Sequence, residues 1–160
     1  MGMVEPLKFS IEPANFRDLS ALQRLEKQCF EADAWSILDL LGVLTFPATV
    51  RYKAVLGQEM IGFAAGDIRN QQQVGWIITI GVQPGFRHQG VARALLSTCE
   101  RHMPVPRIRL CVRLSNRSAI DLYQRAGYQQ LEIWKQYYVG GEDALVMEKE
   151  MPEIQARRED

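Results

Sequence analysis

A short stretch between an expected strand and an expected helix carries residue types suited to binding a phosphate. Residues 76–82 form an apolar, β-branched run of strand length, and Pro84 and Gly85 must end it, because proline lacks the N–H that a sheet needs. From Val91 onward apolar residues recur at helical spacing, so Gly90 stands where a helix begins. The first N–H groups of a helix have no partner within it and carry partial positive charge, which suits a phosphate or pyrophosphate. The alternative is an ordinary helix start after a Pro-Gly turn.

The spacing around this helix start matches one known phosphate motif and lacks two others. The chain has no P-loop pattern and no G-x-G-x-x-G. Arg87-x-x-Gly90-x-Ala92, following a strand, resembles the acetyl-CoA pyrophosphate loop of the GNAT family of N-acetyltransferases, whose pattern is Gln/Arg-x-x-Gly-x-Gly/Ala. The resemblance implies that acetyl-CoA binds at Arg87, His88, Gln89, Gly90, Val91 and Ala92.

A longer resemblance covers the second half of the chain. Arg109-Leu-Cys-Val-Arg113 followed by SNRSAIDLYQRAGY resembles the strand and helix of protein N-terminal acetyltransferases in this family, including Tyr123 four residues before Gly127. Residues 135–147 resemble the Tyr-Tyr, Glu-Asp-Ala and Met hairpin of RimI-type members, which acetylate the N-terminal alanine of a ribosomal protein. The chain is therefore similar to the RimI-type branch of the GNAT family.

This resemblance implies roles in acetyl transfer, a reaction that needs a neutral amine, a polarised acetyl carbonyl and a proton for the departing thiolate. Backbone N–H groups at Ile80 and Val82 would polarise the carbonyl, and Tyr123 would be the general acid. Asn116 and Ser118 would contact acetyl-CoA. Periodicity alone favours two other interpretations: a core tyrosine at position 123 and a helix cap at position 116.

The catalytic base is where this sequence departs from the family pattern. RimI proteins have Glu, and several relatives have His, at the position of Cys111, and a neutral thiol with an unperturbed pKa of ~8.5 is a poor base. An α-amine has a pKa of ~7.7–8.0, so roughly a tenth of it is already neutral at pH 7. Water, Glu31 or Asp33 would then suffice as base, although both acids are also ordinary solvated loop residues.

The acceptor site is expected around the loop after the first helix. The segment CFEADAWS, residues 29–36, resembles a Cys-Phe-x-x-Pro-Trp-Ser segment of RimI-type enzymes, with Ala34 in place of the proline. The alternative interpretations are structural. Residues 29–36 would be a helix-loop-helix with core aromatic residues, and Tyr137 and Tyr138 would be an ordinary tyrosine pair on a strand. The resemblance implies an acceptor site formed by Glu31, Trp35, Tyr137 and Tyr138.

The elements that must position these residues follow from periodicity and turn residues, and they alternate as a mixed α/β fold. Strands are expected over residues 7–12, 49–56, 60–69, 76–82, 107–113, 128–138 and 143–151, and helices over 16–30, 36–45, 90–103 and 116–126. This pattern predicts a single domain over residues 1–160 with a frayed tail at about 152–160. The order resembles the GNAT fold, a mostly antiparallel sheet splayed at the acetyl-CoA cleft and flanked by helices.

The amino-acid composition limits the classes of partner that we expect. The 160 residues contain 19 basic and 19 acidic side chains, which argues against a general nucleic-acid binder, although eight arginines and only two acids lie between Arg87 and Arg125. No apolar run approaches the roughly 20 residues of a membrane helix. Three cysteines without metal-ligand spacing favour reduced thiols, hence a cytoplasmic protein without a metal site.

We therefore expect an acetyl-CoA-dependent N-acetyltransferase that acts on the α-amine of a protein N-terminus, such as that of a ribosomal protein. One alternative is a GNAT enzyme whose acceptor is a lysine side chain or a small amine. The other is an acetyl-CoA-binding module without catalysis, which the missing carboxylate at position 111 keeps open.

Overall fold

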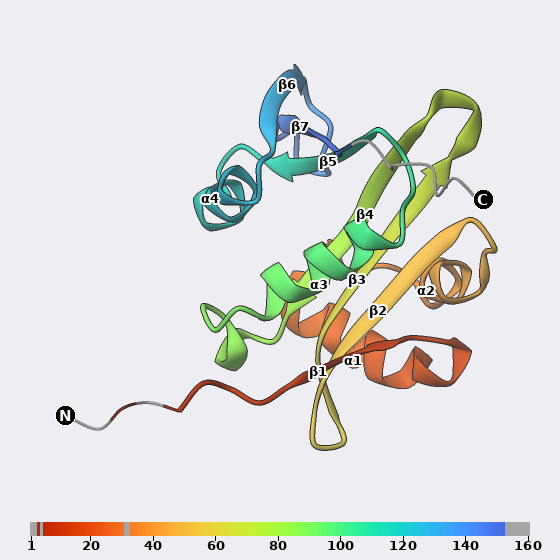
Figure 1. The fold of residues 1–160 in the computed structure, drawn as a ribbon, viewed down its shortest axis with the longest axis vertical. Helices are drawn as coiled ribbons and strands as arrows, with labels where there is room; N and C mark the ends of the chain where they lie inside the picture. The colour runs from red at the N-terminus through yellow and green to blue at the C-terminus, as the bar shows by residue number, and fades with distance from the viewer. Residues whose placement is uncertain (1–2, 4, 31–32, 153–160) are drawn as a thin grey trace, which may run out of the picture.

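One mixed sheet organises the chain (Figure 1). The computed structural model describes residue 3 and residues 5–30 and 33–152. The seven strands lie in the order β1-β2-β3-β4-β5-β7-β6, and all neighbours are antiparallel except β4 and β5, which are parallel. Their bounds are β1 Ser10–Pro13, β2 Thr49–Leu56, β3 Glu59–Arg69, β4 Val74–Val82, β5 Arg107–Arg113, β6 Gln129–Trp134 and β7 Ala144–Glu150.

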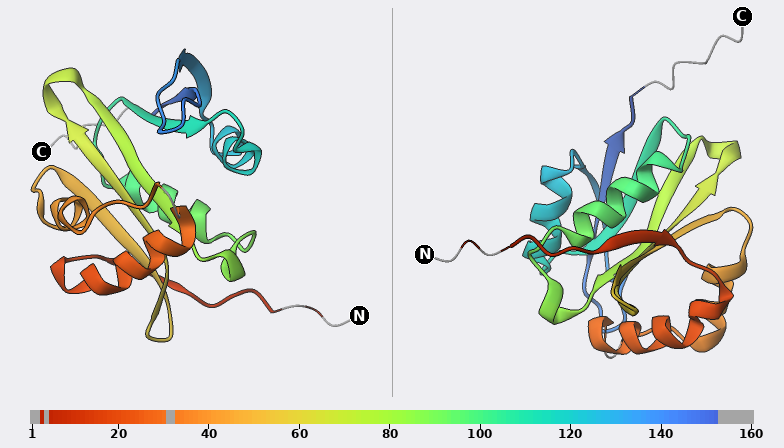
Figure 2. Two further views of the ribbon diagram at one scale, coloured as in Figure 1. Left: turned by 180° about the vertical axis from the view of Figure 1, so that it is seen from behind. Right: turned by 60° about the horizontal axis from the view of Figure 1, so that its bottom comes forward.

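Four helices cover the two faces of this sheet (Figures 1 and 2). They are α1 Leu19–Phe30, α2 Ile37–Thr45, α3 Val91–Arg101 and α4 Arg117–Arg125. A Cβ on Gly62 of β3 would meet Val91 and Leu95, whereas one on Gly81 of β4 would meet Cys29 and Phe30. Helix α3 therefore packs on one face and α1 on the other.

Side-chain caps fix where the helices begin. Asn15 accepts a hydrogen bond from the Arg17 N–H and caps a 3-10 helix that leads into α1, and Ser36 forms a capping box with Asp39 at α2. Asn116 accepts from the Ala119 N–H at the start of α4, at 3.2 Å. The helix-cap interpretation of Asn116 is thus confirmed.

Two cores hold the layers together. The larger lies between the sheet and α3 and α4, and the smaller lies under α1 and α2. Leu95 and Leu96 are 0% exposed in the larger core, and Leu22 is 1% exposed in the smaller. Truncating any of them to alanine would cost about 2–5 kcal/mol of folding free energy.

Most expected elements are confirmed within a few residues, but two strands are shorter than expected. Residues 7–9 lie outside β1, whose pairing begins with Ser10 opposite Val55, close to the turn at Gly57 that ends β2. The strand expected over residues 128–138 ends at Trp134. There the Gln136 N–H donates to the Asp143 carboxylate at 2.9 Å and Gln136 adopts φ 51°, which turns the chain away from the sheet. Residues 153–160 of the expected frayed tail lie outside the described residues.

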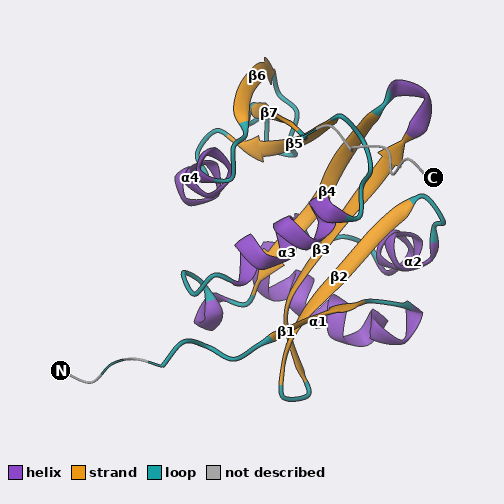
Figure 3. Ribbon diagram, viewed as in Figure 1, coloured by secondary structure: helices purple, strands orange, loops and turns teal. Residues whose placement is uncertain are grey.

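The strand pairing around β4 opens the sheet at its centre (Figures 1 and 3). The parallel pairing of β4 with β5 runs only from Val74 with Arg107 to Ile77 with Leu110, whereas β4 pairs with β3 as far as Val82. Strands β5, β6 and β7 with α4 diverge from β1–β4 beyond that point. The splayed sheet of the GNAT fold is therefore present.

Candidate functional site

A cleft of about 800 Å³ lies where β4 and β5 separate. It brings together several of the expected site residues from distant parts of the chain: Asp33, Trp35, Ile80, Cys111, Asn116, Tyr123, Tyr137 and Tyr138. The expected residues Val82, Arg87, His88, Gln89, Gly90, Val91, Ala92 and Ser118 do not line it. Glu31 lies outside the described residues.

The edge of β4 beside the cleft has free backbone groups. The Gln83 N–H donates to the Ile61 carbonyl of β3 at 2.8 Å. In an antiparallel pair only every second residue bonds the neighbouring strand, so the backbone N–H and C=O groups of Val82 and Ile80 point away from β3. The Val82 carbonyl accepts instead from Arg87 Nε at 3.0 Å. Because β5 has already separated, the Ile80 and Val82 N–H groups point into the gap between the strands.

Tyr123 reaches the cleft from α4. It is 8% exposed, and burial raises the pKa of its hydroxyl to about 12. Its ring contacts Tyr128 edge-on, with the two centroids 6.0 Å apart. The residue is thus both a core tyrosine and a cleft residue, and its hydroxyl keeps its proton throughout the neutral pH range.

The two other residues expected around α4 have different positions. Asn116 combines its cap role with a place in the cleft lining. Ser118 is exposed and lies outside the cleft.

The expected phosphate loop lies at the far end of β4, where residues 83–90 connect the strand to α3. Gly90 adopts φ 84°, and a Cβ placed on it would meet nothing within 4 Å. His88 is also left-handed, with φ 60°, and Arg87, His88, Gln89 and Gly90 are exposed. The Gly90 carbonyl begins the helical hydrogen bonding by accepting from the Ala94 N–H, so the N–H groups before Ala94 have no partner within α3.

Arg113 joins the two loops that flank the cleft. Its guanidinium forms an ion pair with Asp33, from the segment between α1 and α2, and another with Glu142, from the β6–β7 loop, at 2.9 Å. It also lies 4.3 Å from the ring centroid of Tyr138, at contact distance for a cation–π interaction. The bonds to Glu142 and Asp33 raise the pKa of Arg113, and hydrogen bonds from Ser115 and from Arg113 lower the pKa of the Glu142 carboxyl.

An aromatic row forms the wall opposite α1. Trp76 lies 5.8 Å from Trp134, Trp134 lies 5.5 Å from Tyr137, and Tyr137 lies 5.0 Å from Tyr138, measured between ring centroids. The Trp76 indole N–H is buried and has no hydrogen-bond partner among the described residues. An unpaired buried donor costs about 1–3 kcal/mol of folding free energy.

Cys111 faces the α1 side of the cleft, because its neighbours Leu110 and Val112 face the α3 core. Burial and the charge of Glu132 raise the pKa of its thiol. The thiol is therefore neutral near pH 7, which agrees with the expectation that it is not the base.

Glu26 is a cleft residue that the sequence-based reasoning missed. It is 3% exposed, lines the cleft, and its Oε2 accepts from the Trp35 N–H at 3.5 Å. Burial raises the pKa of its carboxyl. The signal was an acid on the same helix face as Leu22 and Leu25, where a solvated glutamate does not belong.

The part of the chain that the structure describes contains no group of three or more His, Cys, Asp or Glu side chains placed to hold a metal ion. None of its helices is long and apolar enough to span a membrane.

The sequence matches a known protein family and two known relatives. The model of the acetyltransferase (GNAT) family matches residues 18–128. An uncharacterized N-acetyltransferase of Methanocaldococcus jannaschii is 31% identical over 140 residues, which cover 85% of this chain and 88% of that protein. The N-alpha-acetyltransferase of Sulfurisphaera tokodaii is 34% identical over 77 residues, 46% of each chain.

Solved structures share the same architecture. The ribosomal-protein-S18-alanine N-acetyltransferase of Escherichia coli superposes with a TM-score of 0.80 and 26% identity, covering 92% of this chain and 98% of that one. Arabidopsis thaliana NAA60 in complex with acetyl-CoA superposes with a TM-score of 0.81 and 21% identity, covering 90% and 100%. At that identity the second likeness is one of fold alone.

Proposed function

Because the chain belongs to the acetyltransferase (GNAT) family, we propose that it transfers the acetyl group of acetyl-CoA to the α-amine of a protein N-terminus in the cleft beside Tyr123. The expected fold and enzyme class, an N-acetyltransferase, are confirmed by this membership. The observation that carries the proposal is the free edge of β4, which lies in the same gap as Tyr123.

The donor end of the site is the loop before α3. Acetyl-CoA, the acetyl donor of this family, supplies an activated thioester when bound. The first-turn N–H groups of α3 and the exposed side chain of Arg87 provide the positive charge that its pyrophosphate requires, and Gly90 leaves room for close approach. Asn116 lines the cleft itself.

The acceptor enters from the opposite face of the sheet. Asp33, Trp35, Tyr137 and Tyr138 surround that entrance, and Arg113 ties its two loops together. The acceptor amine attacks the thioester carbonyl, whose developing negative charge is stabilised by the Ile80 and Val82 N–H groups. The C–N bond forms, the C–S bond breaks, and Tyr123 gives its proton to the departing thiolate.

The amine proton goes to solvent or to a carboxylate through water. Asp33 is a weak candidate base because its carboxylate is already engaged by Arg113 in an ion pair. The site thus suits an amine that is already partly neutral, and an α-amine with a pKa near ~8 fits better than a lysine near ~10.4. The relatives named N-alpha-acetyltransferase and the S18 alanine enzyme support the same acceptor class, with a ribosomal protein as one example. A cytoplasmic location belongs to this proposal and rests on three cysteines that are all free thiols.

The proposal is tested by offering the protein acetyl-CoA with four kinds of acceptor: peptides with free N-termini, the same peptides with blocked N-termini, polyamines and aminoglycosides. Release of free coenzyme A thiol is followed over time. We expect release only with free N-termini. Release with blocked peptides or polyamines would identify a side-chain or small-molecule enzyme instead, and tight acetyl-CoA binding without any release would identify a binding module.

A further inference from the structure

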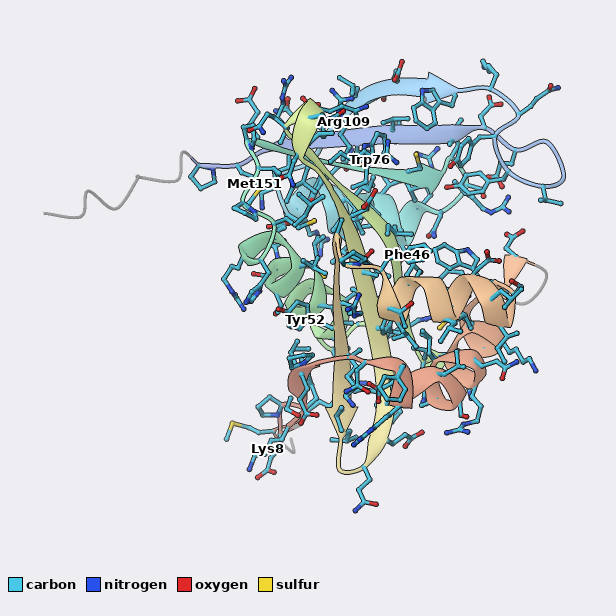
Figure 4. All side chains as sticks on the ribbon, turned by 90° about the vertical axis from the view of Figure 1, so that its right-hand side faces the viewer. Lys8, Phe46, Tyr52, Trp76, Arg109 and Met151 are labelled. Atoms are coloured by element: carbon cyan, nitrogen blue, oxygen red, sulfur yellow. The ribbon has the colours of Figure 1, made fainter. Side chains whose placement is uncertain are left out.

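A second cavity, of about 560 Å³, adjoins the cleft on the side of α2. Trp35 and Ile78 line both cavities, so the two form one continuous groove across the α1–α2 face of the sheet. Figure 4 shows Phe46 at the α2 side of this groove and Trp76 nearer to β5–β7.

The outer face of α2 is apolar although it is exposed. Leu38 is 75% exposed and Phe46 is 64% exposed, and both line the second cavity. The buried face of the helix is already occupied by Leu40 and Leu44, and its acid, Asp39, is used in the cap with Ser36. The sequence therefore places more leucines on this short helix than the core of this chain can bury. Such an exposed apolar surface marks contact with another molecule.

Gly42 shapes the wall of the second cavity. A Cβ on this residue would meet the Phe46 ring at 3.2 Å, so glycine allows that ring to lie against the helix rather than away from it. The ring, Leu38 and Ile78 then present apolar atoms to the same space.

We propose that this cavity is a second acceptor subsite, which binds an apolar side chain of the acceptor polypeptide a few residues after its N-terminus. The inference rests on the proposed function and is argued from the continuity of the groove. An acceptor chain whose amine lies at Ile80 continues along β4, which forms the floor of the groove, toward Ile78. Ile78 is two strand residues, or about 7 Å, away. An extended acceptor covers that distance in about two residues, so the side chain of its second to fourth residue reaches the cavity.

The chemistry of the lining selects the class of side chain. The lining is apolar at Leu38, Phe46 and Ile78 and polar at Asp39, Thr49 and Asp67. A glutamate there would lose hydration and face two carboxylates. A lysine would have to compete with Ser36 and Arg69, which already engage Asp39 and Asp67. Asp67, at the border of the cavity, is engaged by Arg69 at 3.2 Å. Leucine, methionine or phenylalanine is the expected occupant, and in an extended chain the next side chain faces the opposite wall at Trp134.

The test uses a set of peptides with one polar sequence, in which a single leucine is moved through positions two to five. Acetylation kinetics are measured with the wild type, with Leu38→Ser and with the matched control Leu131→Ser, which alters an exposed leucine of β6 outside both cavities. We expect leucine at one of positions two to four to lower the peptide KM roughly tenfold in the wild type. Leu38→Ser should remove this difference in KM between the leucine positions, whereas Leu131→Ser should keep it.

Binding of the same peptides in N-terminally acetylated, fluorescent form separates this inference from the proposed function. Loss of leucine-dependent binding in Leu38→Ser supports the subsite even where no acetyl transfer is observed. Equal KM values for all leucine positions would overturn the subsite even where transfer is fast. A concentration-dependent dimer that Leu38→Ser converts to a monomer would also overturn it, since the α2 face would then belong to a second copy of the chain.

Discussion

Ile77 of β4 and Leu110 of β5 form the last parallel pair of the sheet, and the two strands separate immediately beyond them. All the chemistry proposed for this protein depends on that separation. It leaves the N–H groups of Ile80 and Val82 without a strand partner on that side and opens the cleft that Tyr123 lines from α4.

Gly90→Asp is expected to abolish acetyl-CoA binding, because it would place a carboxylate against the pyrophosphate at the start of α3. The matched control is Gly57→Asp in the β2–β3 turn. Gly57 also has positive φ, 63° against 84° for Gly90, and a Cβ on either residue would meet nothing within 4 Å. Calorimetry should show lost binding only for Gly90→Asp, and equal affinities for both variants would remove this loop from the donor site.

Tyr123→Phe should lower kcat by roughly 10²–10⁴-fold with little change in acetyl-CoA affinity, because proton donation acts in the transition state. Tyr52→Phe on β2 serves as the control tyrosine, since it lies outside the cleft. A Tyr123→Phe rate within twofold of the wild type would mean that the thiolate takes its proton from water.

Cys111 tests how the amine loses its proton. If water or a carboxylate reached through water is the acceptor, the rate should rise with pH as the substrate α-amine titrates near ~8. Cys111→Ser should follow the same profile, because the half-buried thiol with its raised pKa takes no part. Loss of turnover in Cys111→Ser with intact acetyl-CoA binding, or an acetylated Cys111 found by mass spectrometry without acceptor, would show that the thiol participates.

Glu26 should make the protein less stable as the pH rises. Its pKa is higher in the folded state than the unperturbed 4.5, so the folded chain binds more protons and the free energy of unfolding falls above that pH. Glu26→Gln keeps an acceptor for the Trp35 N–H and removes the titration. Urea unfolding at pH 5 and pH 8 should show a smaller decrease for the variant, and an equal decrease in both proteins would contradict this assignment.

Arg113→Ala should raise the acceptor KM about tenfold without changing acetyl-CoA affinity, since it releases Asp33 and Glu142 from their common partner. Arg107→Ala, an exposed arginine of the same strand, is the control. Weakened acetyl-CoA binding in Arg113→Ala would mean that the acceptor loops also shape the donor site.

The order of strands and helices followed from local patterns, because apolar periodicity, Pro-Gly turns and helix caps each act over a few residues. The end of β6 at Trp134 did not, since it depends on Asp143 reaching back to Gln136 from the end of the β6–β7 loop. The gathering of Tyr123, Trp35 and Tyr138 at one cleft came from family resemblance, not from periodicity. Glu26 was detectable as an acid among leucines, but its contact with Trp35 depends on how the chain turns between α1 and α2.

The most direct test of acetyl transfer to an α-amine uses one peptide that carries both a free N-terminus and an internal lysine. After incubation with acetyl-CoA and the wild type, fragmentation mass spectrometry locates the added acetyl group. The proposed function predicts acetylation of the α-amine alone, with the product strongly reduced by Tyr123→Phe. Acetyl groups on the lysine side chain, or an α-amine product that Tyr123→Phe leaves unchanged, would contradict it.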